Sequence, residues 1–317
     1  GPGHWSGVRG VITGSDPAAG EIVYSCHLDH ERPGANDNGS GCVTILESAR
    51  VLARLIASGA LPRPKRTLRF FWGPEVEGTM AYLSRHPDIR ARLRADIHMD
   101  MVGGDPFKNK SILHVTETPW SLPSFVTDVG AALADVIRTG AASYAGSGDA
   151  PETAVIETRA GEQGTRNQFL ADVTPYAAGS DHDDYDSSTV AVPALYLRDW
   201  PDIYIHSAHD TLQQIDPTKL RRVALLGATA GYVYASLNAE GSRDLLPFYA
   251  SQSEVRLAQL FQRALQVVAD PKLDPGAAWY GARNLPGQGR GREPGAWTPR
   301  LNFAGCGRDQ YAPDKQA

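Results

Sequence analysis

Acidic and imidazole side chains along the chain have the types and local settings that a metal-dependent reaction needs. They occur in short segments that read His27-Leu28-Asp29, Asn36-Asp37-Asn38-Gly39, Glu75-Val76-Glu77-Gly78, His98-Met99-Asp100-Met101 and His206-Ser207-Ala208-His209-Asp210-Thr211. Imidazole nitrogens and carboxylate oxygens are common zinc ligands, and a further glutamate can take a proton from zinc-activated water. Together the segments predict a zinc hydrolase site.

Each segment also has an ordinary structural explanation. Asp29 could simply orient a buried His27, Asp37 could serve as a turn residue or helix cap, and His206 could be a loop histidine. Asp100 is harder to explain in this way, because it lies between two methionines in an apolar run. A carboxylate in such a place must be paired or bound to a cation.

The candidate residues follow short runs that favour β-strands. Residues 21–26 precede His27, residues 68–72 precede Glu75, and residues 97–102 contain Asp100. In open α/β sheets the carboxyl ends of strands form the binding site, so these positions favour a shared site. Apolar residues at helical spacing from Cys42 to Ile56 place Asp37 in the turn that leads into a helix.

Strands and helices alternate along the chain without an internal repeat, which predicts an α/β fold with a mixed or largely parallel sheet. Further strands are expected over 112–115 and 193–197. Further helices are expected over 122–141, 217–238 and 251–269, the second capped by Asp216 and the last with a Ser251–Glu254 capping box. We expect an α/β domain over residues 1–240, a helical extension over 241–283 and a Gly/Pro-rich tail over 284–317.

The composition excludes several classes of protein. The chain has 317 residues and a net charge of −5, which offers no basic face for nucleic acid. No apolar run is long enough to span a membrane. The three cysteines, Cys26, Cys42 and Cys306, are too few for a disulfide framework. Free thiols are therefore expected, although one pair is possible. The opening residues, Gly1-Pro2-Gly3-His4, say nothing about export.

The order and context of these segments resemble the zinc aminopeptidases of the M28 family. The family pattern runs His-x-Asp, Gly-Ala-x-Asp-Asn-x-Ser-Gly, Glu-Glu-x-Gly, Asn-x-Asp-Met-x-Gly, Ser-Asp-His and His-Thr-x-x-Asp-Thr. The chain matches it with the segments above, with Gly34-Ala35 before Asn36, Ser40-Gly41 after Gly39, and Ser180-Asp181-His182. The resemblance covers roughly residues 10–240.

The resemblance implies a three-layer α/β/α zinc exopeptidase fold and removal of N-terminal residues from peptide substrates. Carried over by position, Asp37 would bridge two zinc ions, His27 and Asp100 would complete one site, and His206 would contribute to the other. Asp29 would fix the His27 ring, and Glu75 would be the general base. The roles of Asp181 and His182 stay open. Family members are often exported, which favours secretion only slightly.

The chain departs from the family pattern at Val76, where the family has a second, zinc-binding glutamate. Valine cannot bind a metal, so Glu77 or His30 is considered as a replacement, and one zinc ion is as plausible as two. Tyr204 lies one position further from the late histidine than the family's tyrosine and is a candidate oxyanion donor. Residues 143–178 form either a loop over the site or a solvated insertion.

Three other functions remain open. A non-catalytic binding domain of the same fold would explain the loss at Val76, and a single-zinc acyl transferase that cyclises N-terminal glutamine would use a similar carboxylate base. A serine hydrolase built on Gly146-Ser147-Gly148 is least supported, because that segment lacks the strand-to-helix frame of a nucleophile elbow.

Overall fold

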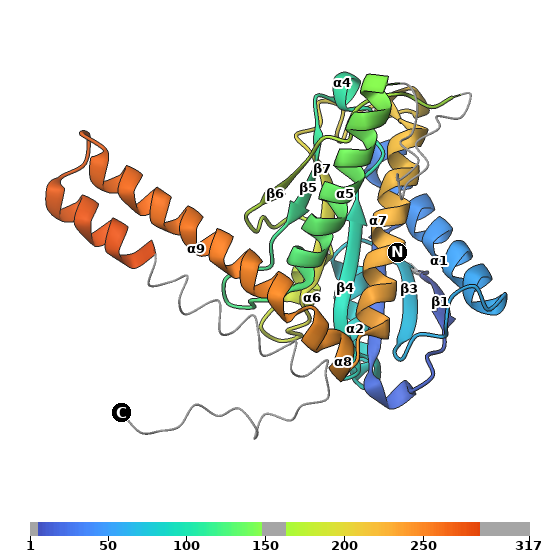
Figure 1. Cartoon of the computed structure of the whole chain (residues 1–317). Helices are drawn as coiled ribbons and strands as arrows, with labels where there is room; N and C mark the ends of the chain where they lie inside the picture. Colours follow the sequence, from blue (N-terminus) through green and yellow to red (C-terminus); the bar gives the residue numbers. More distant parts are fainter. Residues whose placement is uncertain (1–5, 148–162, 286–317) are drawn as a thin grey trace, which may run out of the picture. The chain divides into compact units, whose positions relative to one another are not determined.

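A mixed β-sheet forms the centre of the computed structural model, which describes residues 6–147 and 163–285 (Figure 1). In the described part its strand order is β1-β3-β2-β4-β7-β5-β6. Strands β2, β3, β4 and β7 pair in parallel, whereas β1 is antiparallel to β3 and β5 is antiparallel to β7. The prediction of a mixed, largely parallel sheet is therefore confirmed. The strands are β1 (Val8–Ile12), β2 (Glu21–His27), β3 (Thr67–Gly73), β4 (Leu93–Asp100), β5 (Ile112–Thr116), β6 (Ala171–Thr174) and β7 (Ala194–Trp200).

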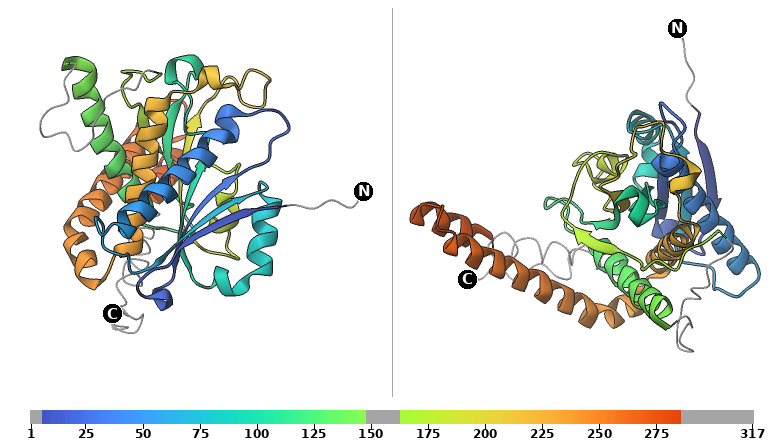
Figure 2. Two further views of the ribbon diagram at one scale, coloured as in Figure 1. Left: turned by 90° about the vertical axis from the view of Figure 1, so that its right-hand side faces the viewer. Right: turned by 90° about the horizontal axis from the view of Figure 1, so that it is seen from above.

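Helices cover both faces of the sheet and give the expected three layers. On one face Tyr24 of β2 donates a hydrogen bond to the carbonyl of Gly227, which lies on α7 (Pro217–Ser236) beside α1 (Gly41–Ala57). On the other face the neighbouring Val23 packs in a cluster with Leu83 and Tyr185. Those two residues come from α2 (Glu77–Arg85) and α6 (His182–Asp186). Successive strand residues point to opposite faces, so both sides of β2 are buried (Figure 2).

The central strands lie where the sequence predicts strands, whereas the edge strands have no clear pattern in the sequence. Strands β2 and β3 are buried along their whole length, which explains their nearly continuous apolar runs. Strands β1 and β6 were not predicted, because they are short and largely exposed at the two edges. The predicted helices correspond to α1, α5 (Val126–Ser147) and α7.

The predicted start of the last helix is wrong. Helix α9 (Leu246–Ala269) begins with Pro247 in its first turn, so Ser251 and Glu254 lie inside the helix rather than at its cap. Proline is favoured in a first turn because its missing N–H is not needed there. This local preference outweighs the Ser–Glu pattern.

The carboxyl ends of the parallel strands meet at one edge of the sheet. His27 at the end of β2 is in register with Gly73 at the end of β3, and β4 ends at Asp100 on the other side of β2. The short η2 segment (Ala35–Ser40) follows β2 and leads directly into α1. This edge therefore receives the side chains that the sequence analysis selected.

The chain divides into two compact units, residues 1–119 with 129–236, and residues 120–128 with 237–317. The sheet belongs to the first unit. The second contains α8 (Ala239–Asp244) and α9, and Arg256 on α9 forms an ion pair with Asp128. The expected boundary near residue 240 stays a prediction. Residues 286–317 of the expected tail, which include Cys306, lie outside the described residues, as does Gly148, whereas Gly146 and Ser147 end helix α5.

The remaining short elements are η1 (Pro17–Ala19), α3 (Pro87–Arg90), α4 (Pro106–Asn109) and η3 (Leu212–Gln214).

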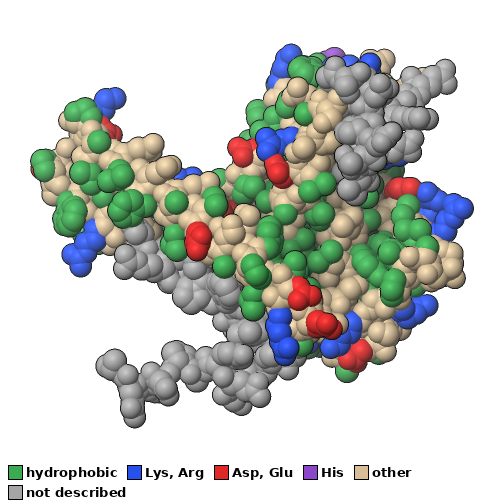
Figure 3. All heavy atoms as spheres, in the orientation of Figure 1, with side chains coloured by type: hydrophobic (Ala, Val, Ile, Leu, Met, Phe, Trp, Pro, Cys, Tyr) green, Lys and Arg blue, Asp and Glu red, His purple; other side chains and the backbone are tan. Residues whose placement is uncertain are grey.

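In residues 6–147 and 163–285, no helix combines the length and the apolar character needed to cross a bilayer. On the face drawn in Figure 3, basic and acidic side chains are interspersed and do not gather into a patch of one sign.

A buried acid on α6 predicts how stability depends on pH. The Asp186 carboxylate accepts a hydrogen bond from the Ala194 N–H, and burial raises the pKa of Asp186 to about 8. The folded state then holds this proton more tightly than the unfolded chain. Stability from this group is present at acidic pH and is lost as the pH rises through about 8.

We expect the melting temperature of the natural protein to fall between pH 6 and pH 9 by roughly 5 °C more than that of Asp186→Asn, which has no proton to lose. Differential scanning fluorimetry across this range measures the difference. Asp172→Asn, at an exposed position of β6, is the control. Parallel curves for the natural protein and Asp186→Asn would contradict the assignment.

Candidate metal centre

Asp37 lies at the centre of the residues that the strand ends bring together. Its Oδ1 is 3.2 Å from His27 Nε2, and its Oδ2 is 3.1 Å from His30 Nε2 and 3.2 Å from His206 Nε2. Asp100 Oδ1 is 3.3 Å from His27 Nε2. The described residues therefore form two groups that could hold a metal ion, and both groups include Asp37.

The spacing and chemistry of both groups suit divalent cations. Ligands placed about 2.0–2.2 Å from a zinc ion in a tetrahedron lie roughly 3.3–3.6 Å from one another. The imidazole-to-carboxylate separations of 3.1–3.3 Å fall close to this range. Each oxygen of Asp37 faces a different group, as a bridging carboxylate requires.

Backbone groups hold the rings of two of the histidines. Nδ1 of His27 is 2.8 Å from the Asp29 carbonyl oxygen, and a proton on this Nδ1 leaves the Nε2 lone pair directed at Asp37, which is the form that binds a metal. Nδ1 of His30 is 2.7 Å from the Arg32 carbonyl oxygen and 3.2 Å from the Arg32 amide nitrogen, so the backbone of Arg32 fixes the position of this ring. We expected Asp29 to orient His27; the structure places its backbone carbonyl, not its carboxylate, on the ring.

The loop that carries Asp37 is held by a carboxylate from a distant segment. The two oxygens of Asp210 accept hydrogen bonds from the backbone N–H groups of Asn36 (2.8 Å) and Asp37 (2.9 Å). Asn38 Oδ1 accepts hydrogen bonds from the N–H groups of Gly41 and Met101, which ties the loop to the exit of β4. The peptide bond between Asp37 and Asn38 is cis. Sequence reasoning missed the role of Asp210, although it lies in the segment of His206.

Two more carboxylates hold the turn after β3. Asp29 accepts a hydrogen bond from the Glu75 N–H (2.8 Å), and Asp181 accepts one from the Val76 N–H (2.6 Å). Val76 has a φ of 48°, a backbone region that a β-branched residue seldom adopts. Because such a conformation persists only when its surroundings impose it, these two contacts keep Glu75 at the edge of the site.

Glu75 has the position and environment of a base. Its Oε1 is 3.8 Å from His27 Nε2, and its side chain is 39% exposed. Burial raises the pKa of Glu75, and the neighbouring Asp100 and Asp37 add to the rise, although His27 opposes it. A pKa shifted toward neutrality suits proton transfer at physiological pH.

A buried row of hydrogen bonds connects Glu75 to the interior. Ser180 hydrogen-bonds to Glu75, and its Oγ lies 2.9 Å from His98 Nε2. His98 Nδ1 is 2.8 Å from Ser25 Oγ, which is 3.0 Å from the Asp96 carboxylate. Sequence reasoning did not identify this row, because its members come from two strands and the start of α6.

The electrostatic balance of the site favours a cation. Burial by itself would lower the pKa of His27, but hydrogen bonds with Asp100 and Asp37 raise it to about 12. Burial would likewise raise the pKa of Asp37, but His27, His30 and His206 hold it below the usual value. In the absence of a metal ion, a proton on His27 supplies part of the positive charge that these carboxylates need.

The other candidates lie apart from the two groups. Glu77 is exposed in the first turn of α2, and the Tyr204 ring packs near His209, with 6.4 Å between ring centroids. His182 is buried, stacks on Tyr196 with ring centroids 3.9 Å apart, and has its Nε2 3.0 Å from the Ala177 carbonyl oxygen. Cys26 and Cys42 are free thiols whose sulfurs lie 3.2 Å apart.

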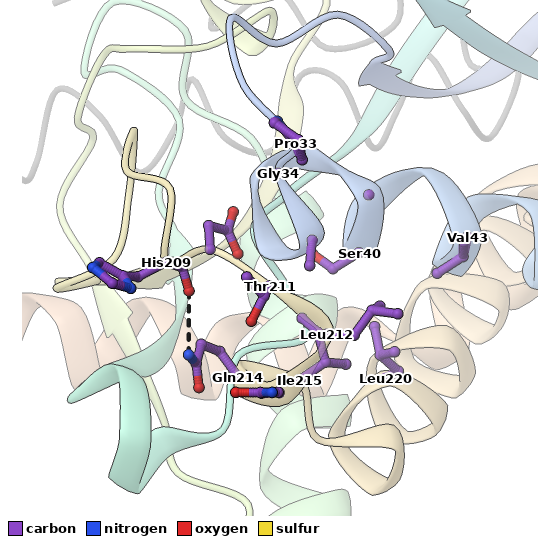
Figure 4. A pocket seen from close by; sticks show the side chains of 14 residues that line it. Pro33, Gly34, Ser40, Val43, His209, Thr211, Leu212, Gln214, Ile215 and Leu220 are labelled. Atoms are coloured by element: carbon purple, nitrogen blue, oxygen red, sulfur yellow. Dashed lines mark hydrogen bonds between the residues drawn. The ribbon is translucent and has the colours of Figure 1, made fainter.

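A mostly apolar pocket of about 750 Å³ lies beside the Asp37 loop (Figure 4). The start of α1 and the segment after His206 line it, with Ser40, Val43, Leu212 and Leu220 among its side chains. Asp210 borders the pocket and also holds the Asp37 backbone. Anything that binds in this pocket therefore lies next to the loop that positions Asp37.

Residues 8–230 match the sequence profile of Peptidase family M28. An aminopeptidase of Pseudomonas aeruginosa is 34% identical over 97 residues, which are 28% of this chain and 16% of that enzyme. Leucine aminopeptidase 1 of Emericella nidulans is 39% identical over 77 residues, 22% of this chain and 19% of that enzyme. These alignments thus span less than a fifth of either relative.

Solved structures share the fold at low identity. The zinc aminopeptidase BSAP of Bacillus subtilis has a TM-score of 0.52 and 20% identity, covering 73% of this chain and 50% of that one. The LapA aminopeptidase of Legionella pneumophila has a TM-score of 0.51 and 22% identity, covering 73% and 54%. The match confirms the zinc exopeptidase fold and carries nothing further about specificity.

The role of Asp210 gives a prediction for metal binding. Asp210→Asn keeps the shape of the side chain but leaves a single acceptor oxygen for two backbone N–H groups. We expect zinc affinity to fall about 10- to 100-fold, because the Asp37 loop loses a fixed support. Competition with a chromophoric chelator measures the affinity, circular dichroism checks the fold, and exposed Asp244→Asn is the control. Equal affinities for the Asp210 variant and the natural protein would refute the role.

Proposed function

Because the chain belongs to peptidase family M28, we propose that it is a zinc-dependent exopeptidase that removes N-terminal residues from peptides. The observation that carries this proposal is Asp37, whose two oxygens face two separate groups of metal ligands. Glu75 lies beside the first group, with its Oε1 3.8 Å from His27 Nε2. Ligands and base are thus gathered at one edge of the sheet.

Some of these residues would bind the metal, and others would transfer protons or position the base. His27, Asp37 and Asp100 would hold one zinc ion, and Asp37 with His206 would hold part of a second site. Bound zinc lowers the pKa of water and polarises a peptide carbonyl. Glu75 accepts the proton of the attacking water at its carboxylate and delivers it to the departing amine nitrogen. Asp29, Asp181 and Ser180 keep that carboxylate in place.

The names of the curated relatives favour an aminopeptidase over other exopeptidases. The aligned enzymes from Pseudomonas aeruginosa and Emericella nidulans are an aminopeptidase and a leucine aminopeptidase. The substrate is therefore proposed to be a peptide with a free N-terminus.

Two alternatives make different predictions. A non-catalytic binding domain would keep the fold but lack chelator-sensitive hydrolysis, and the valine at position 76 is the observation in its favour. A glutaminyl cyclase-like acyl transferase would use one zinc ion and convert an N-terminal glutamine without hydrolysing other peptides. Retention of His27, Asp37, Glu75, Asp100 and His206 around one point favours the hydrolase.

The assignment of Glu75 is tested by Glu75→Gln, which keeps the size of the side chain and removes the base. We expect turnover of aminoacyl-arylamides to fall by about 10²–10⁴-fold or more, with metal content unchanged. Steady-state kinetics and elemental analysis measure the two quantities. Glu47→Gln, an exposed position on α1, is the matched control. A Glu75→Gln variant that keeps most of its activity would contradict the assignment of Glu75 as the base.

The bridging role of Asp37 predicts a different outcome. Asp37→Asn leaves a single carbonyl oxygen, so we expect both zinc content and activity to fall. An arylamide panel run with and without a chelator tests the natural protein alongside it. Unchanged zinc content in Asp37→Asn would exclude bridging, and hydrolysis that no chelator affects would exclude a metallopeptidase.

A further inference from the structure

We propose that His30 takes the place of the metal-binding glutamate that this chain lacks at Val76. The second metal ion would then be held by two imidazoles, His30 and His206, and by one oxygen of Asp37. This inference rests on the proposed metal-dependent function and specifies the ligands of its second site.

The geometry places His30 in that group. Its Nε2 is 3.1 Å from Asp37 Oδ2, the oxygen that also faces His206 Nε2 at 3.2 Å. The rings of His30 and His206 are 5.5 Å apart between centroids. The three donor atoms lie close enough together to share one ion.

His30 is directed inward although its loop is exposed. Its side chain is 12% exposed, whereas Asp29, Glu31 and Arg32 around it are exposed residues. The backbone carbonyl and N–H of Arg32 both contact Nδ1, and Nε2 on the other side of the ring faces the buried carboxylate. An imidazole held in this orientation by contacts to its other nitrogen has the features of a metal ligand.

The chain turns tightly between His30 and Asp37, which lie on the same segment between β2 and α1. A Cβ on Gly34 would lie 1.7 Å from the Asp37 carbonyl oxygen and 3.3 Å from His30 Nδ1. Only glycine permits this close approach of the backbone to Asp37. With this turn, His30 Nε2 lies 3.1 Å from Asp37 Oδ2.

The two alternative positions do not supply a ligand. The N–H of Val76 is used by Asp181 and its side chain has no donor atom. Glu77 begins α2 and is exposed, outside both groups of potential ligands in the described chain. His30 therefore remains the donor that the geometry supports.

The replacement changes the chemistry of the second site. A neutral imidazole in place of a carboxylate removes one negative charge from the ligand set and adds a nitrogen donor. Imidazole suits zinc, copper, iron and nickel, whereas oxygen-rich sets suit magnesium, calcium and manganese. The second site should therefore bind zinc in preference to manganese.

The test measures zinc stoichiometry and affinity of the full chain by calorimetric titration of the metal-free protein, with circular dichroism as a check of folding. We expect two zinc ions for the natural protein and for His209→Ala, a control histidine from the same loop as His206. His30→Ala should bind one tightly, with a loss at the second site greater than the about 10- to 100-fold typical of outer hydrogen-bond partners. His30→Ala combined with Val76→Glu should recover the second ion.

The outcomes separate the two proposals. If the natural protein binds two ions and His30→Ala binds two with the same affinities, His30 is not a ligand, and the proposed hydrolase is unaffected. If the natural protein binds one ion, or the double variant does not recover the second, the replacement is overturned. If the natural protein binds no zinc, the proposed function fails as well.

Discussion

The burial of the Asp37 carboxylate is the constraint on which the site depends. Asp37 is 4% exposed, and Asp100 is also buried. The Nε2 atom of His27 contacts both carboxylates, at 3.2 Å from Asp37 and 3.3 Å from Asp100. Such groups stay charged in a protein interior only when cations or hydrogen-bond donors compensate them. The Nε2 atoms of three imidazoles face Asp37. Because a neutral imidazole has no charge, the positive charge of the site must come from protons on these rings or from bound metal ions.

Further carboxylates act on the backbone and thereby place the residues that do the chemistry. Asp210 holds the amides of the Asp37 loop, while Asp29 and Asp181 hold consecutive amides at Glu75 and Val76. Charge-assisted hydrogen bonds of this kind are stronger than neutral ones, so short loops between a strand and a helix become rigid. The sheet supplies the common edge, and these contacts set the final positions of the proposed ligands and base.

Much of the fold and part of the site follow from local sequence patterns. The apolar runs of β2, β3 and β4 and the periodicity of α1 and α7 are strong signals because these elements are buried. Edge strands β1 and β6 have no such signal, and the start of α9 was set by Pro247 rather than by Ser251 and Glu254. His27, Asp37, Asp100, His206 and Glu75 could be selected by residue type and by their place at strand ends. Ser180, His98 and Asp96 could not, because a buried hydrogen-bond row assembled from separate segments leaves no spacing in the sequence.

The sequence by itself determined the fold class, the family and the set of candidate ligands, because these depend on local periodicity and on residue types at fixed spacings. It also identified the loss at Val76, for which it offered Glu77 as the nearest replacement and His30 as another. Only the tertiary structure shows which of these side chains faces Asp37. His30 Nε2 lies 3.1 Å from Asp37 Oδ2, with the tight turn at Gly34 between them, whereas Glu77 is exposed at the start of α2. The direction of a side chain depends on how loops from different strands pack, and spacing along the chain does not encode that packing.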